Sequence, residues 1–225
     1  LMLLMTVLIA VFFLLNLLLG SVDIPLRSVC RILAGGTGEP VVWQNIVWKS
    51  RVPQALTALV AGAGLSVSGL QMQTVFRNPL ADPSVLGVSS GASLGVAMVV
   101  LLSGAVGGVA LSRLGYLGEV ALSLAAIVGA MSVMALIVYV SMKVRGNVTL
   151  LIIGVMIGYV ANAVIGVLKF FSVEEDIRAY VIWGLGSFAR VSGDQMLLFV
   201  GIMAVLLPLS FLLIKTMNLL LLGNS

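Results

Sequence analysis

The placement of the charged residues is the feature that most constrains what this chain can fold into. All 12 Lys and Arg residues and all 8 Asp and Glu residues lie outside six uncharged windows. A charge at the centre of a bilayer costs about 2.5–3.5 kcal/mol even on a lenient scale, so windows this clean indicate selection against charge. Each window holds about 20 residues or more, the length that a helix needs to cross roughly 30 Å of hydrocarbon. The windows cover residues 1–22, 52–76, 83–112, 120–142, 146–168 and 195–214.

Composition and periodicity narrow the fold class further. The chain is 61% hydrophobic and 9% charged, whereas a soluble domain carries about 25% charged residues. A transmembrane β-barrel needs apolar and polar residues to alternate over about ten positions, and runs such as LMLLMTVLIAVFFLLNLLLG do not alternate. We therefore predict an all-α membrane protein, a polytopic transmembrane helix bundle in one domain over residues 1–225. The expected spans lie at about 1–22, 52–76, 84–104, 120–142, 147–168 and 195–214.

The first window is expected to be an anchor helix rather than a cleaved signal peptide. No basic region precedes it, no small-x-small site stands before Ser21, and further spans follow. Because the numbering starts at Leu1 rather than Met, we expect a cytoplasmic leader to be missing from it. Cys30 is the single cysteine and the chain has no histidine, so neither an internal disulfide nor a metal site of the usual nitrogen and sulfur type is expected. We also expect no cofactor.

Charge also bears on orientation, because loops between successive spans alternate sides. One set of loops holds Arg77, Lys143, Arg145 and Lys215 against Asp82, and the other set holds eight basic and seven acidic residues. The short, cleanly basic loops of the first set favour the cytoplasm, although the raw count of Lys and Arg points the other way. The preferred arrangement puts loops 21–51, 113–119 and 169–194 outside.

Two of these outer loops are predicted to contain short helices. SVDIPLRSVCRIL has apolar residues near helical spacing, and FSVEEDIRAYVIWGLGSF has a similar pattern with Trp183 at interface depth. The acidic run of the second segment, at 174–176, is either a solvated first turn stabilised by the helix dipole or a functional cluster. The apolar residues of the first segment are Ile24, Leu26, Val29, Ile32 and Leu33.

Small residues repeat every four positions in two of the spans. In lipid, small-xxx-small faces let helix backbones pack closely, and this explains the first stripe, at Gly87, Gly91 and Gly95. The second stripe differs because it places an amide in mid-membrane, where the side chain either bonds a neighbouring helix or faces a wet pathway. Its members are Gly154, Gly158, Asn162 and Gly166.

The sequence contains no catalytic constellation. It lacks the phosphate-binding pattern G-x-x-x-x-G-K-[ST] and has no histidine for a nucleophile–base pair. We therefore predict that the chain is not an enzyme and does not hydrolyse ATP itself. Any uphill transport would draw its energy from a partner or an ion gradient.

One long segment resembles a known family. The stretch WKSRVPQALTALVAGAGLSVSGLQMQTVFRNPLADPSVLGVSSGASLG resembles the FecCD family of bacterial ABC importer permeases, whose pattern is R-x-P-R, S-G-x-x-x-Q and then R-N-P-L-A-x-P-x-x-L-G-V-x-x-G-A. LLIIGVMIG resembles the family's fifth span, and IRAYVIWGLGSF resembles its R-x-x-x-x-W-x-x-G-S segment. The matching residues are Arg51, Pro53, Ser68, Gly69, Gln73, Arg77, Asn78, Pro79, Leu80, Ala81, Pro83, Leu86, Gly87, Val88, Gly91, Ala92, Arg178, Trp183, Gly186 and Ser187.

The resemblance implies a fold and a set of partners. A permease of ten helices would pair with a second copy as a homodimer, sit on cytoplasmic ATP-binding subunits in the inner membrane, and receive cargo from a periplasmic substrate-binding protein. The implied cargo is an iron chelate (siderophore), haem or vitamin B12. The lipid bilayer is the other expected partner, and no nucleic acid is expected.

The resemblance also implies roles for particular residues. Arg51 would pair with glutamates of the binding protein at the outer surface, while the family's second arginine is Gln54 here, a departure for which Lys49 could substitute. Arg178 would lie near the outer mouth, within reach of an anionic cargo. The fifth span would line the pathway, with Gly154, Gly158 and Asn162 facing it.

The segment RNPLADPSVLGVSSGASLG is interpreted as architectural, although it identifies the family best. The pairs Asn78-Pro79 and Asp82-Pro83 are expected to stop the second helix and restart the third, since a residue before proline avoids helical geometry. Arg77 would mark the cytoplasmic side.

The family continues beyond MNLLLLG into a coupling helix and four more spans, whereas this sequence reaches Ser225. The expectation is therefore either a fragment of a longer permease or a truncated product. The alternative function is a relict half-permease that acts as a membrane scaffold and does not transport.

Overall fold

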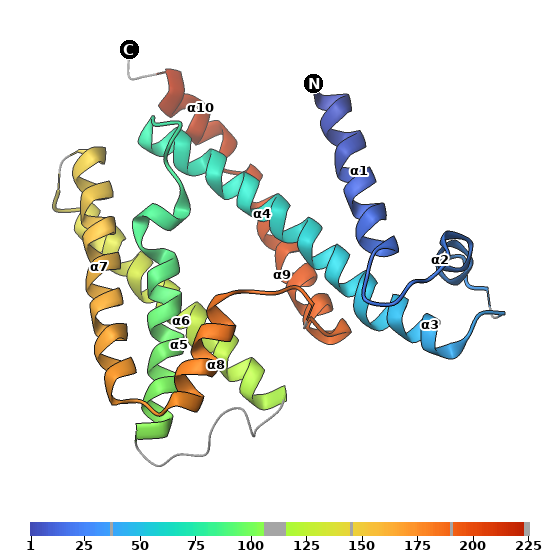
Figure 1. Cartoon of the computed structure of the whole chain (residues 1–225). Helices are drawn as coiled ribbons and strands as arrows, with labels where there is room; N and C mark the ends of the chain where they lie inside the picture. The colour runs from blue at the N-terminus through green and yellow to red at the C-terminus, as the bar shows by residue number, and fades with distance from the viewer. Residues whose placement is uncertain (37, 106–115, 145, 190, 223–225) are drawn as a thin grey trace. The chain divides into compact units, whose positions relative to one another are not determined.

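A computed structural model describes residues 1–36, 38–105, 116–144, 146–189 and 191–222. These residues form helices joined by short turns, and within those ranges there is no strand (Figure 1). The chain divides into two compact units. Unit 1 comprises Leu1–Val67 and Ser187–Thr216, and unit 2 comprises Ser68–Gly186 and Met217–Ser225. The expectation of a single domain over residues 1–225 stays a prediction.

All six uncharged windows form helices, which confirms the predicted fold class. The second window forms α4 with the predicted bounds, Val52–Phe76. The others form α1 (Met2–Leu18), α5 (Val88–Ala105), α6 (Tyr116–Ser141), α7 (Asn147–Phe171) and α9 (Gly193–Phe211).

The number of long spans is smaller than predicted. Among the described residues, four helices are long and apolar enough to cross a membrane: Val41–Phe76, Gly118–Ser141, Val148–Phe171 and Gly193–Phe211. Helices α1 and α5 are shorter. Helix α1 stops at Leu18, because Leu19 is extended. Helix α5 starts late, because the 3-10 helix η2 (Pro83–Leu86) occupies the beginning of its window. Residues 106–112 of that window and 113–115 of the predicted outer loop lie outside the described residues.

Unit 1 contains the first predicted outer helix, α2 (Leu26–Leu33), followed by α3 (Val41–Ile46) and the π-helix η1 (Val47–Arg51). Val29 and Ile32 of α2 are buried against Ile24 and Val47. The other apolar residues of the predicted face, Leu26 and Leu33, are exposed, so only part of that face is covered. Helix α2 therefore packs by a narrow apolar stripe.

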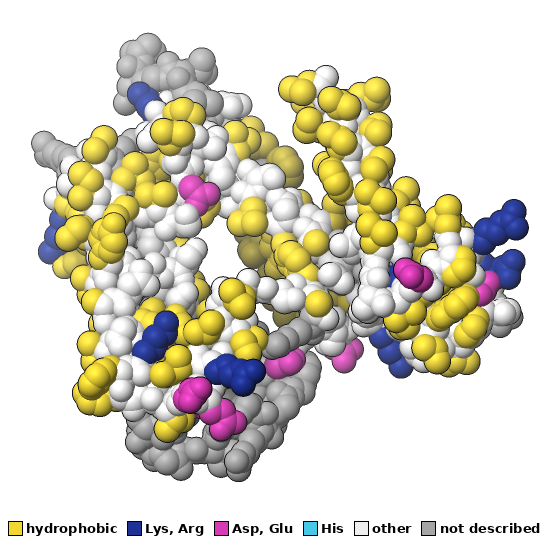
Figure 2. Space-filling model, in the orientation of Figure 1, with side chains coloured by type: hydrophobic (Ala, Val, Ile, Leu, Met, Phe, Trp, Pro, Cys, Tyr) yellow, Lys and Arg dark blue, Asp and Glu magenta, His cyan; other side chains and the backbone are white. Residues whose placement is uncertain are grey.

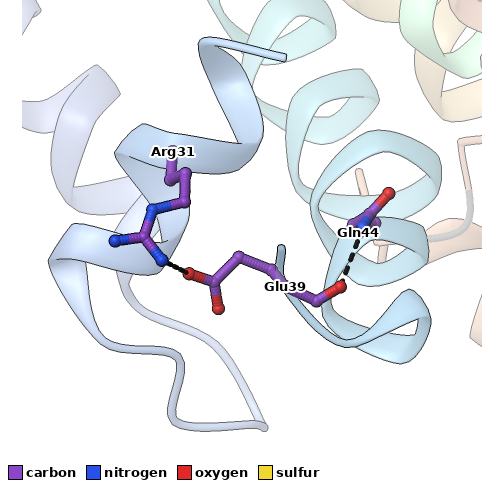
Figure 3. Close-up of polar contacts among 3 residues, drawn as sticks. All are labelled: Arg31, Glu39 and Gln44. Carbon is purple, nitrogen blue, oxygen red and sulfur yellow. Dashed lines mark hydrogen bonds and ion pairs between the residues drawn. The ribbon is translucent and has the colours of Figure 1, made fainter. Parts of the chain in front are cut away.

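An ion pair closes the turn between α2 and α3 (Figure 3). Arg31 donates a hydrogen bond from Nη1 to Glu39 Oε1 at 2.9 Å, and the Gln44 side chain donates to the Glu39 carbonyl at 2.8 Å. The Arg31 side chain is largely exposed and that of Glu39 is 9% exposed. The contact thus joins the end of α2 to the first turns of α3.

In unit 2, helices α5 and α6 approach until their backbones touch. A Cβ atom added at Gly95 would lie 2.2 Å from the Ala125 carbonyl oxygen, and one at Gly129 would lie 2.2 Å from the Gly91 carbonyl oxygen. Real Cβ atoms do not come that close to backbone, so side chains larger than hydrogen cannot occupy these positions unless the helices move apart. The structure confirms the packing interpretation of the first glycine stripe.

The second predicted outer helix is α8 (Glu174–Gly184), which covers one end of unit 2. Tyr180 is buried with Ala97, Leu101 and Ile165, and Trp183 packs against the same cluster. In Figure 1 the end of α4, the start of α7 and α10 (Ile214–Leu222) lie at the opposite end of unit 2 from α8. This agrees with the alternation of loops predicted from the spans.

Apolar side chains cover much of the outer surface of the helices (Figure 2). Examples from three spans are Met131 (66% exposed), Tyr159 (67%) and Val205 (66%). A soluble protein rarely exposes such faces over several helices. Lipid or further protein is expected to cover them.

The glycine contact between α5 and α6 generates a stability prediction. We expect Gly95→Ala to lower the free energy of unfolding by about 1–3 kcal/mol, because the new methyl group must push two backbones apart. Gly166→Ala in α7 is the matched control, since nothing lies within 4 Å of its Cβ position and alanine favours helix. The measurement is the thermal midpoint of the purified protein in detergent. Equal midpoints for Gly95→Ala and Gly166→Ala would contradict the packing described here.

Candidate functional site

The first predicted docking residue, Arg51, is buried. Its side chain is 4% exposed, and its guanidinium donates hydrogen bonds to the carbonyls of Leu17 (2.9 Å), Leu18 (2.8 Å) and Val22. The first two carbonyls belong to the end of α1, where four backbone acceptors have no partner within the helix. Arg51 therefore caps α1 and ties it to the start of α4.

Two local features make this cap possible. A Cβ atom at Gly20 would lie 2.9 Å from Arg51 Nη2, so any larger residue at position 20 would require the guanidinium to shift. Arg51 also ends the π-helix η1, which turns less per residue than an α-helix and changes the direction of the side chains that follow. Neither feature was recognised from the sequence, although Gly20 stands at the end of the first uncharged window.

The second predicted docking residue, Lys49, lies in the same π-helix but is exposed. Arg27 and Arg31 are also exposed, and Figure 2 shows Lys and Arg side chains gathered over the edge formed by α2 and α3. Of the two residues predicted for docking, only Lys49 presents its charge to the surface of this chain. The docking role itself stays a prediction.

The second small-residue stripe divides into two parts. A Cβ atom at Gly154 would lie 2.8 Å from Leu86 Cα, and one at Gly158 would lie 3.2 Å from Ser90 Oγ. These two glycines therefore pack α7 against η2 and α5. Nothing lies within 4 Å of the Cβ position of Gly166, and Asn162 is exposed.

The geometry of an α-helix explains this division. A repeat of four residues advances by about 40° per step on a helix of 3.6 residues per turn. Asn162 is therefore turned about 80° from Gly154, away from the buried face that Ala161 and Ile165 continue. The predicted role of this stripe in a pathway stays a prediction, and only Asn162 has a side chain that is free to serve it.

Helix α8 presents the remaining predicted pathway residue, Arg178, which is exposed. The acidic run at its start is not uniform. Glu174 and Glu175 are exposed, as a solvated first turn predicts, whereas Asp176 is 7% exposed. Its Oδ2 atom has no hydrogen-bond partner among the described residues. Sequence reasoning missed this buried carboxylate because all three acids lie within one turn.

Tyr180 continues the buried face of α8. Burial raises the pKa of its hydroxyl, and a hydrogen bond with the Ser93 side chain of α5 lowers it in part. The Lys169 ammonium at the end of α7 lies 4.7 Å from the centre of the tyrosine ring, within the range of a cation–π contact. Three helices thus meet at this tyrosine.

The turn after α4 is built as predicted, by proline and side-chain caps. The Arg77 N–H donates to the Thr74 carbonyl (3.2 Å), and the Asn78 N–H donates to the Gln73 carbonyl (3.1 Å). These two bonds form a Schellman motif, which normally places glycine where Arg77 stands. Arg77 has φ +48°, a left-handed conformation that costs a non-glycine residue about 1–2 kcal/mol. Asn78 Oδ1 accepts a hydrogen bond from the Leu80 N–H across Pro79 (2.9 Å).

The second half of the turn restarts the chain as a helix. Asp82 Oδ1 accepts a hydrogen bond from the Ser84 N–H at 2.7 Å, with Pro83 in the first turn of η2. The hydrogen bonds from the Ser84 side chain and backbone hold the pKa of the Asp82 carboxyl below its ordinary value. Gly87 ends η2 with φ +75°, and a Cβ there would meet the Gly154 carbonyl oxygen at 2.9 Å. The architectural interpretation of this segment agrees with these contacts.

Comparison with known proteins identifies the family. Residues 8–225 match the FecCD transport family. The chain belongs to the FecCD transport family. With its apolar helices, this makes it a multi-pass protein of the bacterial inner membrane.

Its relatives include two kinds of permease. The chain is 34% identical over 176 residues to the vitamin B12 import system permease protein BtuC of Pectobacterium atrosepticum, an alignment that covers 76% of this chain and 50% of the relative. It is 39% identical over 183 residues to the probable iron chelatin transport system permease protein of Helicobacter pylori, covering 80% of this chain and 51% of the relative. The chain therefore spans about half the length of these relatives.

A solved structure agrees with the fold. It is an inward-facing conformation of a protein assigned to the metal-chelate type of ABC transporter, with a TM-score of 0.76 and 27% sequence identity. The match covers 97% of this chain and 63% of that chain. The FecCD assignment predicted from RNPLADP and its neighbours is thus confirmed by the family match, and the solved structure agrees with the fold.

The cap formed by Arg51 generates the second prediction. We expect Arg51→Gln to lower the free energy of unfolding by about 2–4 kcal/mol, because it removes a buried charge that binds helix-end carbonyls. Lys49→Gln, which removes an exposed charge two residues away, is the matched control and should change little. Thermal unfolding of the purified protein in detergent measures both. If Arg51→Gln unfolds at the same temperature as Lys49→Gln, Arg51 does not hold α1 in place.

Proposed function

We propose that this chain forms part of the transmembrane permease of a bacterial ABC importer. Its cargo would be an iron chelate, haem or cobalamin, delivered by a periplasmic binding protein. The permease would act as a homodimer on cytoplasmic ATP-binding subunits, which hydrolyse the ATP. The observation that supports this most is the family match over residues 8–225, together with relatives that are vitamin B12 and iron chelatin permeases.

The docking of the binding protein is proposed to use Lys49. Its ammonium is exposed at the N-terminal side of α4, in the same unit as the exposed arginines of α2. Arg51 was also a candidate, but its guanidinium is occupied by three backbone carbonyls. An exposed charge at the rim of an interface acts mainly through steering of the partner, and Lys49 meets that requirement.

The translocation pathway is proposed to involve Asn162 and Arg178. Asn162 is an exposed amide in an apolar span, a placement that favours a wet pathway or a polar partner. Arg178 is an exposed cation on α8, where an anionic cargo could bind. Gly154 and Gly158 would support the pathway only indirectly, by fixing α7 against η2 and α5.

Transport by the polypeptide that the gene encodes tests the proposed function. We expect vesicles that contain it with its ATP-binding subunits and binding protein to accumulate cobalamin, haem or a ferric chelate only when ATP is present. The control is the same assembly with an inactive ATP-binding subunit. Equal uptake with the active and the inactive ATP-binding subunit would contradict the proposal of an ABC importer. No ATP-dependent uptake of any of the three cargo classes would favour the alternative, a scaffold that does not transport.

Binding of the periplasmic protein tests the docking residue. We expect Lys49→Glu to slow association of the binding protein by about tenfold at low salt, with a smaller effect at high salt, because ions screen rim charges. Lys215→Glu makes the same charge change on an exposed residue of α10, where no docking is proposed. Surface plasmon resonance on permease in nanodiscs measures both rates. Equal rates for Lys49→Glu and the unmodified protein at low salt would remove Lys49 from the proposal.

A further inference from the structure

Arg77 makes a long-range contact that the turn around it does not require. Its Nη2 donates a hydrogen bond to the carbonyl of Leu220 at 2.7 Å, across 143 positions of sequence. Both residues belong to unit 2. The contact joins the end of α4 to the last turn of α10.

The acceptor lies in the last described turn of α10, and the hydrogen bond is exposed. That turn contains no basic residue of its own. Arg77 therefore brings a cation to this part of α10 from another helix.

The donor is held rigidly by its surroundings. The Schellman bonds of Arg77 and Asn78 fix the backbone on one side, and the hydrogen bond from Leu80 to Asn78 fixes it on the other. Pro79 further restricts the same turn. The Cα atom of Arg77 is thus a fixed point from which its guanidinium reaches α10.

The backbone conformation of Arg77 indicates that its side chain matters. Its φ of +48° is unfavourable for any residue with a Cβ atom, and glycine is the residue that a Schellman motif normally places there. A turn whose only task was to end α4 would be more stable with glycine. The arginine is strained where it stands, and the structure shows one contact that glycine could not make.

We propose that Arg77 is a positioning residue that clamps α10, through the Leu220 carbonyl, to the turn after α4. Because the end of α4, the start of α7 and α10 share one end of unit 2 (Figure 1), and their short loops are expected in the cytoplasm, the clamped segment faces the ATP-binding subunits. The proposal rests in this last respect on the proposed function, and it assigns Arg77 to the coupling of ATP hydrolysis with transport.

A distance measurement tests the clamp without any transport. Spin labels at Leu80→Cys and Leu219→Cys, both exposed positions, report the separation of the two elements in the polypeptide that the gene encodes. Cys30 and any other native cysteine are replaced by serine, and the protein is placed in liposomes. We expect one narrow distance distribution with Arg77. Loss of one charge-assisted hydrogen bond should reduce the clamped population about tenfold in Arg77→Gly, and Arg77→Lys should give an intermediate result.

Replacing Arg77 with glycine distinguishes a clamp on α10 from a purely local role in the turn. Arg77→Gly relieves the backbone at position 77, so a purely local role predicts an unchanged or more stable protein and an unchanged distance. Lys215→Ala is the matched control, because it removes an exposed cation from α10 that takes no part in the hydrogen bond between Arg77 and Leu220. An unchanged distance distribution in Arg77→Gly overturns the proposal.

A second readout tests the link to coupling. We expect Arg77→Gly to reduce the cargo moved per ATP hydrolysed in vesicles, while its thermal midpoint stays at or above that of the unmodified protein. Normal coupling with a broadened distance distribution overturns the role in coupling. If the unmodified protein does not transport, the proposed function fails, and the distance measurement still decides whether the clamp exists.

Discussion

A backbone carbonyl in the last turn of a helix has no donor within the helix, so it must bind water or another donor. This requirement explains the arrangement of the best-defined polar contacts in the chain. Arg51 binds the final carbonyls of α1, Arg77 binds a carbonyl of α10, and a Schellman motif closes α4. The start of η2 has the complementary need for an acceptor, which Asp82 supplies. The Arg51 cap is buried, where a polar group without a partner would cost several kcal/mol, whereas the Arg77 and Asp82 contacts are exposed.

The caps also show why a charged residue cannot be assigned a surface role from its position in a sequence motif alone. Arg51 and Lys49 lie two residues apart at the same helix start, yet Arg51 is buried (4% exposed) and Lys49 lies at the surface. The difference comes from the π-helical turn and from Gly20, which together turn Arg51 toward α1. Their chemistry diverges accordingly: Arg51 stabilises the chain, and Lys49 is available to a partner.

The helices and the family were predictable because their signals are local. The uncharged windows predicted the positions of the helices, the Asn-Pro and Asp-Pro pairs predicted the turn at 78–83, and RNPLADP with its neighbours identified the FecCD transport family. The side-chain roles were less predictable, since they depend on residues far apart in sequence. The bond between Arg77 and Leu220 spans 143 positions. In the stripe that contains Asn162, the orientation of α7 decides which glycines face η2 and α5, and this orientation is not evident from the spacing alone. The burial of Asp176 and the contact of Tyr180 with Ser93 likewise required three-dimensional packing.

The glycine contacts between α5 and α6 have a mechanical consequence. Gly91 and Gly95 fit against Gly129 and Ala125 so closely that the added Cβ positions reach backbone oxygen atoms. Sliding either helix by one residue would bring a larger side chain into a space that holds none, and separating the helices would sacrifice their close dispersion contact. The two helices therefore resist both shear and separation. Any rearrangement of this chain moves α5 and α6 together as one rigid unit, and conformational change must occur at their ends.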